Sequence, residues 1–388
     1  MTFKFPLATA TWDQKEIDAM HDVIASGNFT MGKKVGLFEK SFSKYIGSQY
    51  AVMVNSGSSA NLLMIAALFY TKNPKLKLKR GDEVIVPAVS WSTTYYPLYQ
   101  YGLKIKFVDI DIETLNYDLV QLESAITNKT RVVLAVNLLG NSNNFDFIDK
   151  VIKDKDIVLI EDNCESMGAT FNNKKAGTFG VMGTFSSFYS HHISTMEGGT
   201  IVTDDEELYQ ILISLRSHGW TRDLPVKNLI CSDKSDNLLD ESFRFVLPGY
   251  NVRPLELEGV LGIEQVKKLP MIISERRKNA KLFVETLSNH SDLLIQKEIG
   301  ESSWFGFSII IRPGSSLTRK DLVSKLNNLG FELRPIVTGN FLKNEVIKFF
   351  DYEIHGSLKN AEHLDKNGLF IGNHHYPMPE AFQALLNI

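Results

Sequence analysis

The segment Gly183–Asp205 reads GTFSSFYSHHISTMEGGTIVTDD, which has the form of two short strands joined by a polar turn. The first strand is predicted at Thr184–Tyr189, and the second, which follows a pair of glycines, at Thr200–Thr203. The turn between them carries two adjacent histidines, His191 and His192, and no lysine. Imidazole takes up and releases protons near neutral pH, but a pair of histidines more often belongs to the surface or the core, so the turn alone leaves both interpretations open.

Outside this unit, short apolar strands alternate with helical segments from about residue 50 onward. Several strands are continuous apolar runs, as expected of strands that are buried on both faces of a mainly parallel sheet. The predicted fold class is therefore α/β, with a mainly parallel mixed sheet in a large domain and a smaller C-terminal α/β domain. The other predicted strands are Tyr50–Val54, Glu83–Pro87, Lys104–Val108, Val132–Val136 and Val158–Ile160.

Amphipathic helices are predicted at residues 13–26 and 37–45, and each ends at a glycine. A long helix at Pro254–Leu287, with a break near Pro270, is expected to lead out of the large domain. Further helices are predicted at Ala60–Tyr70, Leu119–Ala125 and 205–216, and a loop that reaches over another surface is predicted at Asp223–Ser242.

The length of 388 residues allows two domains, which we expect at residues 1–260 and, with a linking helix, at residues 261–388. A net charge of −3 shows no basic excess, which argues against nucleic acid or an anionic membrane as a partner. No apolar run approaches the ~18–20 residues that cross a bilayer, and the N-terminus lacks the apolar core of a signal peptide. A cytoplasmic location is therefore expected. The two cysteines, Cys164 and Cys231, are too few for a disulfide framework, and no metal site is predicted.

The stretch NSGSSANLLMIAAL at Asn55–Leu68 predicts a cup for a phosphate group. A strand ends in this Ser/Gly cluster and a helix begins in it, so backbone N–H groups and hydroxyls point at one place. Gly57 allows close approach of a ligand, and Ser58 adds a hydroxyl. A well-capped helix after a strand uses the same residues, so this motif alone leaves both interpretations open.

The stretch IVLIEDNCESMGA at Ile157–Ala169 places three carboxylates at the C-terminal end of a buried strand, where ligands bind in α/β sheets. Strand alternation puts Glu161 and Asp162 on opposite faces, so only one of them can contact a ligand directly. Glu165 follows in the loop. Without the other motifs, acidic residues in a surface loop are an equal alternative.

Two further loops carry candidate ligand contacts. In PAVSWSTTYYPL, Pro87–Leu98, Trp91 could stack on a planar ring, although an aromatic residue at such a position more often belongs to the core. In LPGYNVRPLELEG, Leu247–Gly259, Asn251 and Arg253 precede a helix, and an ordinary loop with a proline helix start is the alternative.

Taken in order, these motifs resemble the nucleotide-sugar aminotransferases of the fold-type I superfamily, which use pyridoxal phosphate (PLP). The match runs from the first helix to about residue 265 and continues more weakly beyond, including Arg334. In that family the strand–turn–Gly-Gly–strand unit carries the lysine that binds the cofactor. Here no lysine lies between Lys175 and Lys227, and His191 occupies its position. The replacement is similar to that in the nucleotide-sugar 3-dehydratases of the family, and this similarity covers essentially the whole chain. It is carried by VPAVSWSTTYYPL, EDNCESMGATFNN, GTFSSFYSHHISTMEGG, LPGYNVRPLE, SSWFGFS and RPIVTGNFLKN.

The resemblance implies a role for each motif residue by matching position. His191 is implied to be the catalytic base, and Asn251 is implied to reach the cofactor phosphate from the other subunit of a homodimer. The residues implied to bind the cofactor are Gly57, Ser58, Trp91, Asp162, Glu165, Ser186 and Asn251. Those implied to contact the substrate are His218, Arg253 and Arg334.

The resemblance also implies the reaction. Pyridoxamine phosphate (PMP), the amine form of the cofactor, would react with the 4-keto group of GDP-4-keto-6-deoxy-D-mannose. The 3-hydroxyl would then leave, with His191 as the base, to give GDP-4-keto-3,6-dideoxy-D-mannose, and L-glutamate would restore PMP. The expected partners are the GDP-linked sugar, L-glutamate and a second copy of the chain with shared active sites. An iron–sulfur cluster is not expected, because it takes four cysteines.

Three alternatives stay open. A dehydratase for a CDP-linked 4-keto-6-deoxyhexose also carries histidine at this position, but it uses a [2Fe–2S] cluster. A nucleotide-sugar aminotransferase would transfer the amino group and leave the 3-hydroxyl in place. A protein that has lost its lysine and serves only to bind ligands is the third.

Overall fold

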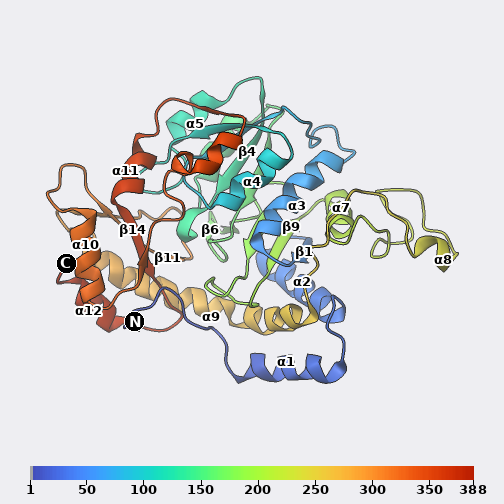
Figure 1. Ribbon diagram of the computed structural model, residues 1–388, viewed down its shortest axis with the longest axis horizontal. Coiled ribbons are helices and arrows are strands. Elements are labelled where there is room, and N and C mark those ends of the chain that lie inside the picture. The colour runs from blue at the N-terminus through green and yellow to red at the C-terminus, as the bar shows by residue number, and fades with distance from the viewer. Residues whose placement is uncertain (1–2) are drawn as a thin grey trace.

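The computed structural model describes residues 3–388, which form two main β-sheets with helices around them (Figure 1). The larger sheet has eight strands in the order β1-β9-β8-β5-β4-β2-β3-β13, and all neighbouring pairs are parallel except the two that β9 makes. The prediction of an α/β fold with a mainly parallel mixed sheet is confirmed. The strands are β1 Tyr50–Val54, β2 Glu83–Pro87, β3 Lys104–Val108, β4 Thr130–Val136, β5 Val158–Asp162, β8 Gly183–Ser186, β9 Gly199–Thr203 and β13 Tyr352–Ile354.

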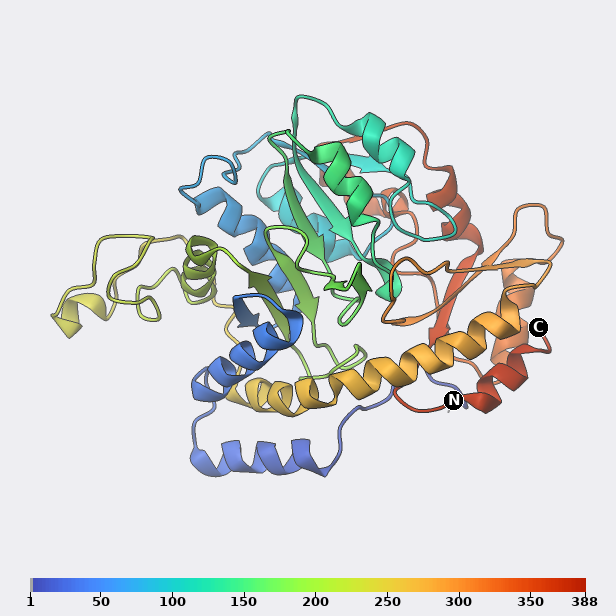
Figure 2. The same cartoon turned by 180° about the vertical axis from the view of Figure 1, so that it is seen from behind.

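Helices cover both faces of the larger sheet (Figures 1 and 2). Alternate residues of one strand pack against different helices: Val84 and Val86 of β2 join the core with α3, α4 and α7, whereas Ile85 joins the core with α5 and α6. This burial on both faces explains why the strands are apolar throughout. These helices are α3 Gly57–Tyr70, α4 Ser92–Gln100, α5 Leu119–Ala125, α6 Phe145–Ile152 and α7 Glu206–Arg216.

The topology brings five strand ends to one edge of the sheet. β9 is antiparallel to both β1 and β8, so β1 runs in the same direction as β8 and the parallel strands beyond it. The carboxyl ends of β1, β2, β4, β5 and β8 therefore meet, and each continues into one of the predicted motifs or into the loop after β4. This is the edge at which open α/β sheets bind ligands.

The histidine turn begins earlier than the sequence pattern predicts. β8 ends at Ser186, not at Tyr189. The reason is a local set of hydrogen bonds: Ser187 N–H donates to the Gly198 carbonyl at 3.0 Å, and Thr195 N–H donates to the Ser187 carbonyl at 2.9 Å. The chain after Ser186 is thereby folded back on itself and leaves the ladder.

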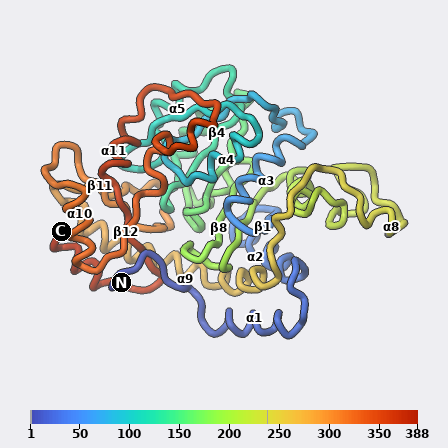
Figure 3. Tube along the Cα trace, viewed as in Figure 1, coloured from blue at the N-terminus to red at the C-terminus, as the bar shows by residue number. Residues whose placement is uncertain are grey.

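The smaller sheet has four antiparallel strands in the order β10-β11-β14-β12, with α10 (Arg319–Asn328) and α12 (Pro379–Leu385) nearby (Figures 1 and 3). The N-terminal segment lies against it, since the Phe5 and Phe331 rings are 4.6 Å apart. β13, by contrast, leaves the C-terminal region and pairs with β3 of the larger sheet. The strands are β10 Leu293–Ile295, β11 Gly306–Ile311, β12 Leu333–Arg334 and β14 Gly368–Gly372.

The long helix α9 spans Glu256–Leu287 without interruption, so the expected break near Pro270 is wrong. Proline removes one backbone hydrogen bond, but buried side chains on both sides of it, Leu269 and Ile272 among them, pack in one core with α2 (Lys33–Ile46). That packing holds the helix together through the proline. No helix within residues 3–388 is long and apolar enough to cross a membrane.

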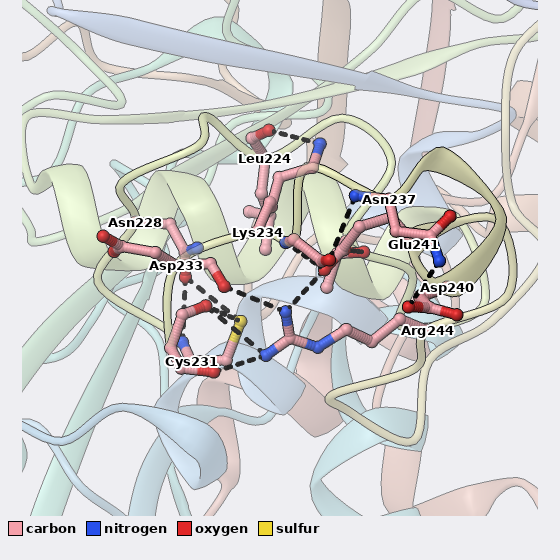
Figure 4. Close-up of polar contacts among 12 residues, drawn as sticks. Leu224, Asn228, Cys231, Asp233, Lys234, Asn237, Asp240, Glu241 and Arg244 are labelled. Atoms are coloured by element: carbon pink, nitrogen blue, oxygen red, sulfur yellow. Dashed lines mark hydrogen bonds and ion pairs between the residues drawn. The ribbon is translucent and has the colours of Figure 1, made fainter.

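Residues 223–245 form an arm that projects from the rest of the chain in Figures 1 and 2 and carries the short helix α8 (Leu238–Glu241). Polar contacts inside the arm fix its shape (Figure 4). Arg244 Nη1 lies 2.8 Å from Glu241 Oε1, and Lys234 Nζ donates to the Leu224 carbonyl at 3.0 Å. The segment predicted as a loop over another surface thus extends away from its own chain.

Candidate active site

A cavity of about 890 Å³ lies where the carboxyl ends of the large-sheet strands face the smaller sheet. We refer to it as the central cavity. It is lined by motif residues from the strand ends of the large sheet, by the histidine turn, and by residues from the N-terminus and the small sheet. The sequence-predicted residues that line it are Gly57, Ser58, Trp91, Asp162, Glu165, Ser186, His191 and Arg334.

The first turn of α3 forms a cradle at one end of the central cavity. Ser56 is the N-cap, and its hydroxyl accepts the Ser59 N–H at 3.1 Å. The amides of Gly57 and Ser58 that follow are in the first helical turn, where N–H groups have no acceptor within the helix. A Cβ at Gly57 would lie only 2.7 Å from the Ser186 Cβ, so glycine lets the helix and β8 meet this closely. An anion fits this arrangement of helix end and hydroxyls.

Asp162 closes β5 at the floor of the central cavity and is 5% exposed. Its Oδ2 accepts hydrogen bonds from Asn61 Nδ2 and Thr94 Oγ1, both at 2.8 Å. Glu161 points to the other face, where it accepts the backbone N–H groups of Gly177, Phe179 and Gly180. Strand alternation therefore leaves one carboxylate, that of Asp162, for the cavity and gives the other a structural role.

Trp91 caps the N-terminus of α4 and lines the mouth of the central cavity with 58% of its surface exposed. An indole left this open offers a flat apolar face to a ligand. The neighbouring tyrosines belong to the core instead: Tyr95 is fully buried, with its hydroxyl donating to the Pro87 carbonyl at 2.8 Å. Tyr96 packs near Phe341.

His191 lies in the wall of the central cavity, and its buried Nδ1 has no hydrogen-bond partner among the described residues. The imidazole packs edge-on against the Phe305 ring at 5.0 Å and lies 5.9 Å from the Phe188 ring. Burial, and after it the positive charge of Arg276, lowers the pKa of His191 to about 4. The imidazole is therefore neutral at neutral pH and free to accept a proton.

His192 has different surroundings from His191. It is fully buried, does not line the central cavity, and its Nε2 is 3.1 Å from the Ser303 carbonyl oxygen. Burial holds its pKa well below the usual value. Adjacent positions in a tight turn thus place one imidazole at the cavity and the other in the packing against Ser303.

Glu165 is the second carboxyl group in the central cavity. Its Oε2 accepts the Leu139 N–H at 3.0 Å, and burial raises its pKa to about 7. Leu139 itself has a left-handed backbone, with φ at +52°. Because Glu165 exchanges a proton near neutral pH, it can serve either as a hydrogen-bond acceptor or as a donor toward a ligand.

Three predicted site residues do not line the central cavity among the described residues: His218, Asn251 and Arg253. They lie together elsewhere on the surface of the chain. Asn251 pairs with Ser217 in an isolated bridge, and its Oδ1 accepts a hydrogen bond from Arg253 Nε at 3.1 Å. The His218 ring is 4.8 Å from that of Trp220.

The structure also adds residues that the sequence motifs do not identify. The N-terminal segment reaches the central cavity because Leu7 N–H donates to Glu332 Oε2 at 3.0 Å. Glu332 in turn lies 3.3 Å from Arg334 Nη2. No local pattern marks the contact of Leu7 with Glu332, since the two residues are 325 positions apart along the chain. The added lining residues include Leu7, Ala8, Glu197, Phe305, Glu332 and Phe370.

The shape and polarity of the central cavity fit a planar aromatic ring that carries a phosphate. The cradle at Gly57 suits the phosphate, the Asp162 carboxylate suits a protonated ring nitrogen, and Trp91 offers a stacking face. The unpartnered Nδ1 of His191 suits a polar group beside the ring. PLP and PMP have this form. No group of three or more His, Cys, Asp or Glu side chains within residues 3–388 could hold a metal ion.

A model of the DegT/DnrJ/EryC1/StrS aminotransferase family matches residues 10–386. The chain belongs to this family. Within it, the GDP-4-keto-6-deoxy-D-mannose 3-dehydratase of Escherichia coli O55:H7 is 65% identical to this chain over 371 residues, which cover 95% of each protein. A solved structure of GDP-4-keto-6-deoxymannose-3-dehydratase with a trapped PLP–glutamate geminal diamine matches at a TM-score of 0.97 and 62% identity, over 99% of both chains. A mutant of that enzyme with bound GDP-perosamine matches with the same TM-score, identity and coverage.

Proposed function

We propose that this protein is a PLP/PMP-dependent lyase that removes the 3-hydroxyl of GDP-4-keto-6-deoxy-D-mannose. The product is GDP-4-keto-3,6-dideoxy-D-mannose, and L-glutamate regenerates PMP in a transamination half-reaction. Such a product feeds the synthesis of 3,6-dideoxysugars such as colitose for lipopolysaccharide O-antigen. The observation that carries the proposal is His191, whose low pKa keeps it neutral and whose Nδ1 has no hydrogen-bond partner within residues 3–388, at the position where aminotransferases of this family carry lysine. The similarity to the named 3-dehydratases supports the choice of substrate.

The cofactor is held in this proposal by non-covalent contacts alone. The amides of Gly57 and Ser58, with the Ser186 hydroxyl, bind its phosphate, while Asp162 meets its ring nitrogen and Trp91 covers its face. Asn61 and Thr94 keep the Asp162 carboxylate oriented. When bound, PMP supplies an amine for the 4-keto carbon and a protonated ring that accepts negative charge.

His191 moves the protons. With a pKa of about 4, its imidazole is unprotonated at neutral pH and takes a proton in the cavity, where burial excludes competing water. The same imidazole, once protonated, is an acid that can return the proton to the departing 3-hydroxyl. Its pKa in the empty cavity is low, so the protonated form gives up its proton readily.

Two further groups act on the substrate side. Glu165, with a pKa near 7, donates or accepts a hydrogen bond within the cavity, depending on pH. Arg334 stands at the cavity wall with its side chain largely exposed, and its ion pair with Glu332 is loose at 3.3 Å. A guanidinium in this position binds an anionic part of the sugar nucleotide or the glutamate carboxylate.

The functional unit is proposed to be a homodimer with shared active sites. His218, Asn251 and Arg253 do not line the central cavity of their own chain, and the arm at residues 223–245 projects from the rest of the chain. The arm exposes large apolar side chains, with Leu239 80% and Phe243 72% exposed. Apolar surface of this kind normally marks a protein–protein contact.

A cytoplasmic location is also proposed, because both cysteines are free thiols.

Subunit complementation tests the shared site. A His191→Asn chain and an Asn251→Asp chain are each expected to be inactive alone, the second because its carboxylate repels the phosphate. If Asn251 serves the partner's site, hybrid dimers contain one fully intact site, and mixing the two chains under exchange conditions restores activity. A chain with both substitutions, mixed with itself, is the control. No recovery from stable hybrid dimers would contradict the shared site.

The reaction is tested by a product assay with GDP- and CDP-linked 4-keto-6-deoxy sugars side by side. With the GDP-linked sugar, 2-oxoglutarate and ammonia are expected to form in step with a 3-deoxy ketone, and each turnover requires glutamate. A stable 4-amino sugar with its 3-hydroxyl intact would identify an aminotransferase. Faster turnover of the CDP-linked sugar would assign the other base, and failure of glutamate to convert added PLP to PMP would indicate a protein that only binds.

A further inference from the structure

The wall behind His191 is built by the segment Ser302–Phe305, which comes from the small domain. Its backbone is pinned to the large domain: Ser303 N–H donates to the Gly140 carbonyl at 2.9 Å, and Phe305 N–H donates to the Leu139 carbonyl at 3.0 Å. The fit is tight, since a Cβ at Gly140 would lie 2.5 Å from the Trp304 nitrogen. His191 therefore rests on a joint between the two domains.

The backbone at this joint is strained. Trp304 has φ at +47° and Leu139 has φ at +52°, both in the left-handed region that residues with a Cβ rarely adopt. Left-handed residues of this kind cost about 1–3 kcal/mol each and persist only where the surrounding structure holds them. Leu139 also donates its N–H to Glu165, so both strained residues stand directly behind side chains of the cavity.

Arg276 of α9 holds the other side of the same segment. Its Nη1 donates to the Trp304 and Phe305 carbonyls at 3.3 Å and 2.9 Å, and the residue is 4% exposed. No carboxylate pairs with it among residues 3–388, and its Nε has no partner. A buried, unpaired guanidinium is expensive to keep, which argues that it has a function beyond packing.

We infer that Arg276 is a positioning residue for His191, which it serves by fixing the backbone of Trp304 and Phe305 so that the Phe305 ring supports the imidazole. The Phe305 ring contacts both histidines of the turn, at 5.0 Å from His191 and 5.6 Å from His192. His192 reinforces the arrangement, because its Nε2 meets the carbonyl oxygen of Ser303 in the same segment. The catalytic use of this position rests on the proposed function, whereas the positioning itself does not.

Arg276 also acts on His191 through its positive charge, which lowers the pKa of the imidazole. Arg276 on α9 adds to burial in lowering the pKa of His191 and of His192 in the same turn. The carboxyl groups of Asp162, Glu165 and Glu197 line the same cavity as His191. Burial is the larger cause of the low pKa, so the main role that the geometry gives Arg276 is to fix the wall behind the imidazole, while its charge helps to keep the imidazole unprotonated.

Three variants separate these contributions. Arg276→Lys keeps the charge but loses the two-carbonyl clamp, Arg276→Gln loses the charge, and Phe305→Leu removes the ring while it keeps an apolar side chain. Lys278→Gln, two residues further along α9 and on its exposed side, is the matched control. The first readout is the titration of the His191 imidazole by NMR in the cofactor-free protein, assigned with the His191→Asn variant. The second is kcat and KM across pH.

In the cofactor-free protein, Arg276→Gln is expected to raise the His191 pKa while Arg276→Lys leaves it low. Arg276→Lys and Phe305→Leu are each expected to lower kcat by roughly 10- to 100-fold, because the His191 imidazole is displaced. KM and cofactor affinity should stay close to wild type, because the cradle at Gly57 does not move. Lys278→Gln should change none of these quantities.

Two results would overturn the inference. One is wild-type kcat in folded Arg276→Lys and Phe305→Leu proteins, and the other is a parallel loss of cofactor affinity and kcat, which indicates a purely structural arginine. If Arg276→Gln does not fold, Phe305→Leu still decides the question. If the wild-type protein lacks dehydratase activity but Arg276→Lys, which keeps the charge, still shifts the NMR signals of the His191 imidazole, the proposed function fails and the positioning role stands.

Discussion

Gly57→Ala is the substitution whose effect the structure defines most sharply. The new Cβ would lie 2.7 Å from the Ser186 Cβ and 3.0 Å from the Cys164 Sγ, both of which belong to the strand ends β8 and β5 and their loops. The Ser186 Cβ is attached directly to the backbone of β8 and cannot rotate away, so the first turn of α3 must move away from β8. Overpacking of this kind costs about 1–3 kcal/mol, part of which is offset by the helix preference of alanine.

The same movement widens the cradle in which the cofactor phosphate is proposed to bind. Since about 1.4 kcal/mol corresponds to a tenfold change in affinity, a cradle strained by 1–3 kcal/mol predicts a loss of roughly 10- to 100-fold in PLP affinity. The measurement is a PLP titration followed by absorbance, together with urea unfolding of the cofactor-free protein. The urea unfolding measures the change in the free energy of unfolding separately from the change in PLP affinity.

Gly36→Ala is the matched control, because Gly36 also lies in a helix, α2, and a Cβ there meets no atom within 4 Å. It is expected to stabilise the protein by up to about 1 kcal/mol and to leave PLP affinity unchanged. Wild-type PLP affinity in a Gly57→Ala protein that is destabilised as expected would refute the assignment of this cradle to the phosphate.

Three further outcomes are expected. The His191→Asn variant should bind PLP yet fail to eliminate the 3-hydroxyl, because an amide cannot accept a proton. The His191→Lys variant should give an imine-type absorbance with PLP and lose the dehydratase activity. Wild-type rates in the His191→Asn variant would point to another base. Burial, and after it Arg276, lowers the pKa of His374 from 6.5 to about 4, so the unfolded chain binds a proton at a higher pH than the folded chain does. The free energy of unfolding should therefore fall by up to about 3 kcal/mol as the pH drops from about 6.5 toward 4. Urea unfolding at pH 7 and pH 5 checks this, and an equal fall of the unfolding free energy in the His374→Gln variant would contradict it. Enzyme purified anaerobically with a chelator should keep full activity, and a brown, iron-containing protein would require the radical route of the CDP-type enzymes to be reconsidered.

The sequence predicts the parts of the site that depend on local pattern. The end of β1 at Val54 is predicted correctly, whereas β5 and β8 are located by pattern but end at Asp162 and Ser186, not at the predicted Ile160 and Tyr189. The sheet topology then gathers these strand ends at one edge. Strand alternation also separates Glu161 from Asp162 correctly. These features need no knowledge of distant residues, because each is fixed within about ten residues of chain.

The parts that sequence reasoning misses depend on contacts between distant segments. Phe305 reaches His191 only because Ser303–Phe305 is pinned to residues 139–140, and nothing in SSWFGFS marks that contact. Pro270 indicates a break in the long helix, but α9 continues through it because packing against α2 outweighs the loss of one backbone hydrogen bond. Tertiary packing decides both cases.

The loss of the lysine changes which residues control cofactor occupancy. Where a lysine holds PLP covalently, weakening one contact to the phosphate leaves the cofactor attached. In this chain the affinity for PLP and PMP is proposed to rest on the cradle at Gly57, the Asp162 carboxylate and the face of Trp91. The loss of any one of these contacts therefore lowers cofactor affinity directly. A cofactor held in this way can exchange between cycles, which matches a reaction that consumes the amino group of PMP at each turnover and needs glutamate to restore it. In the proposed mechanism the histidine therefore has two consequences: it supplies the base for elimination, and it leaves cofactor binding dependent on non-covalent contacts.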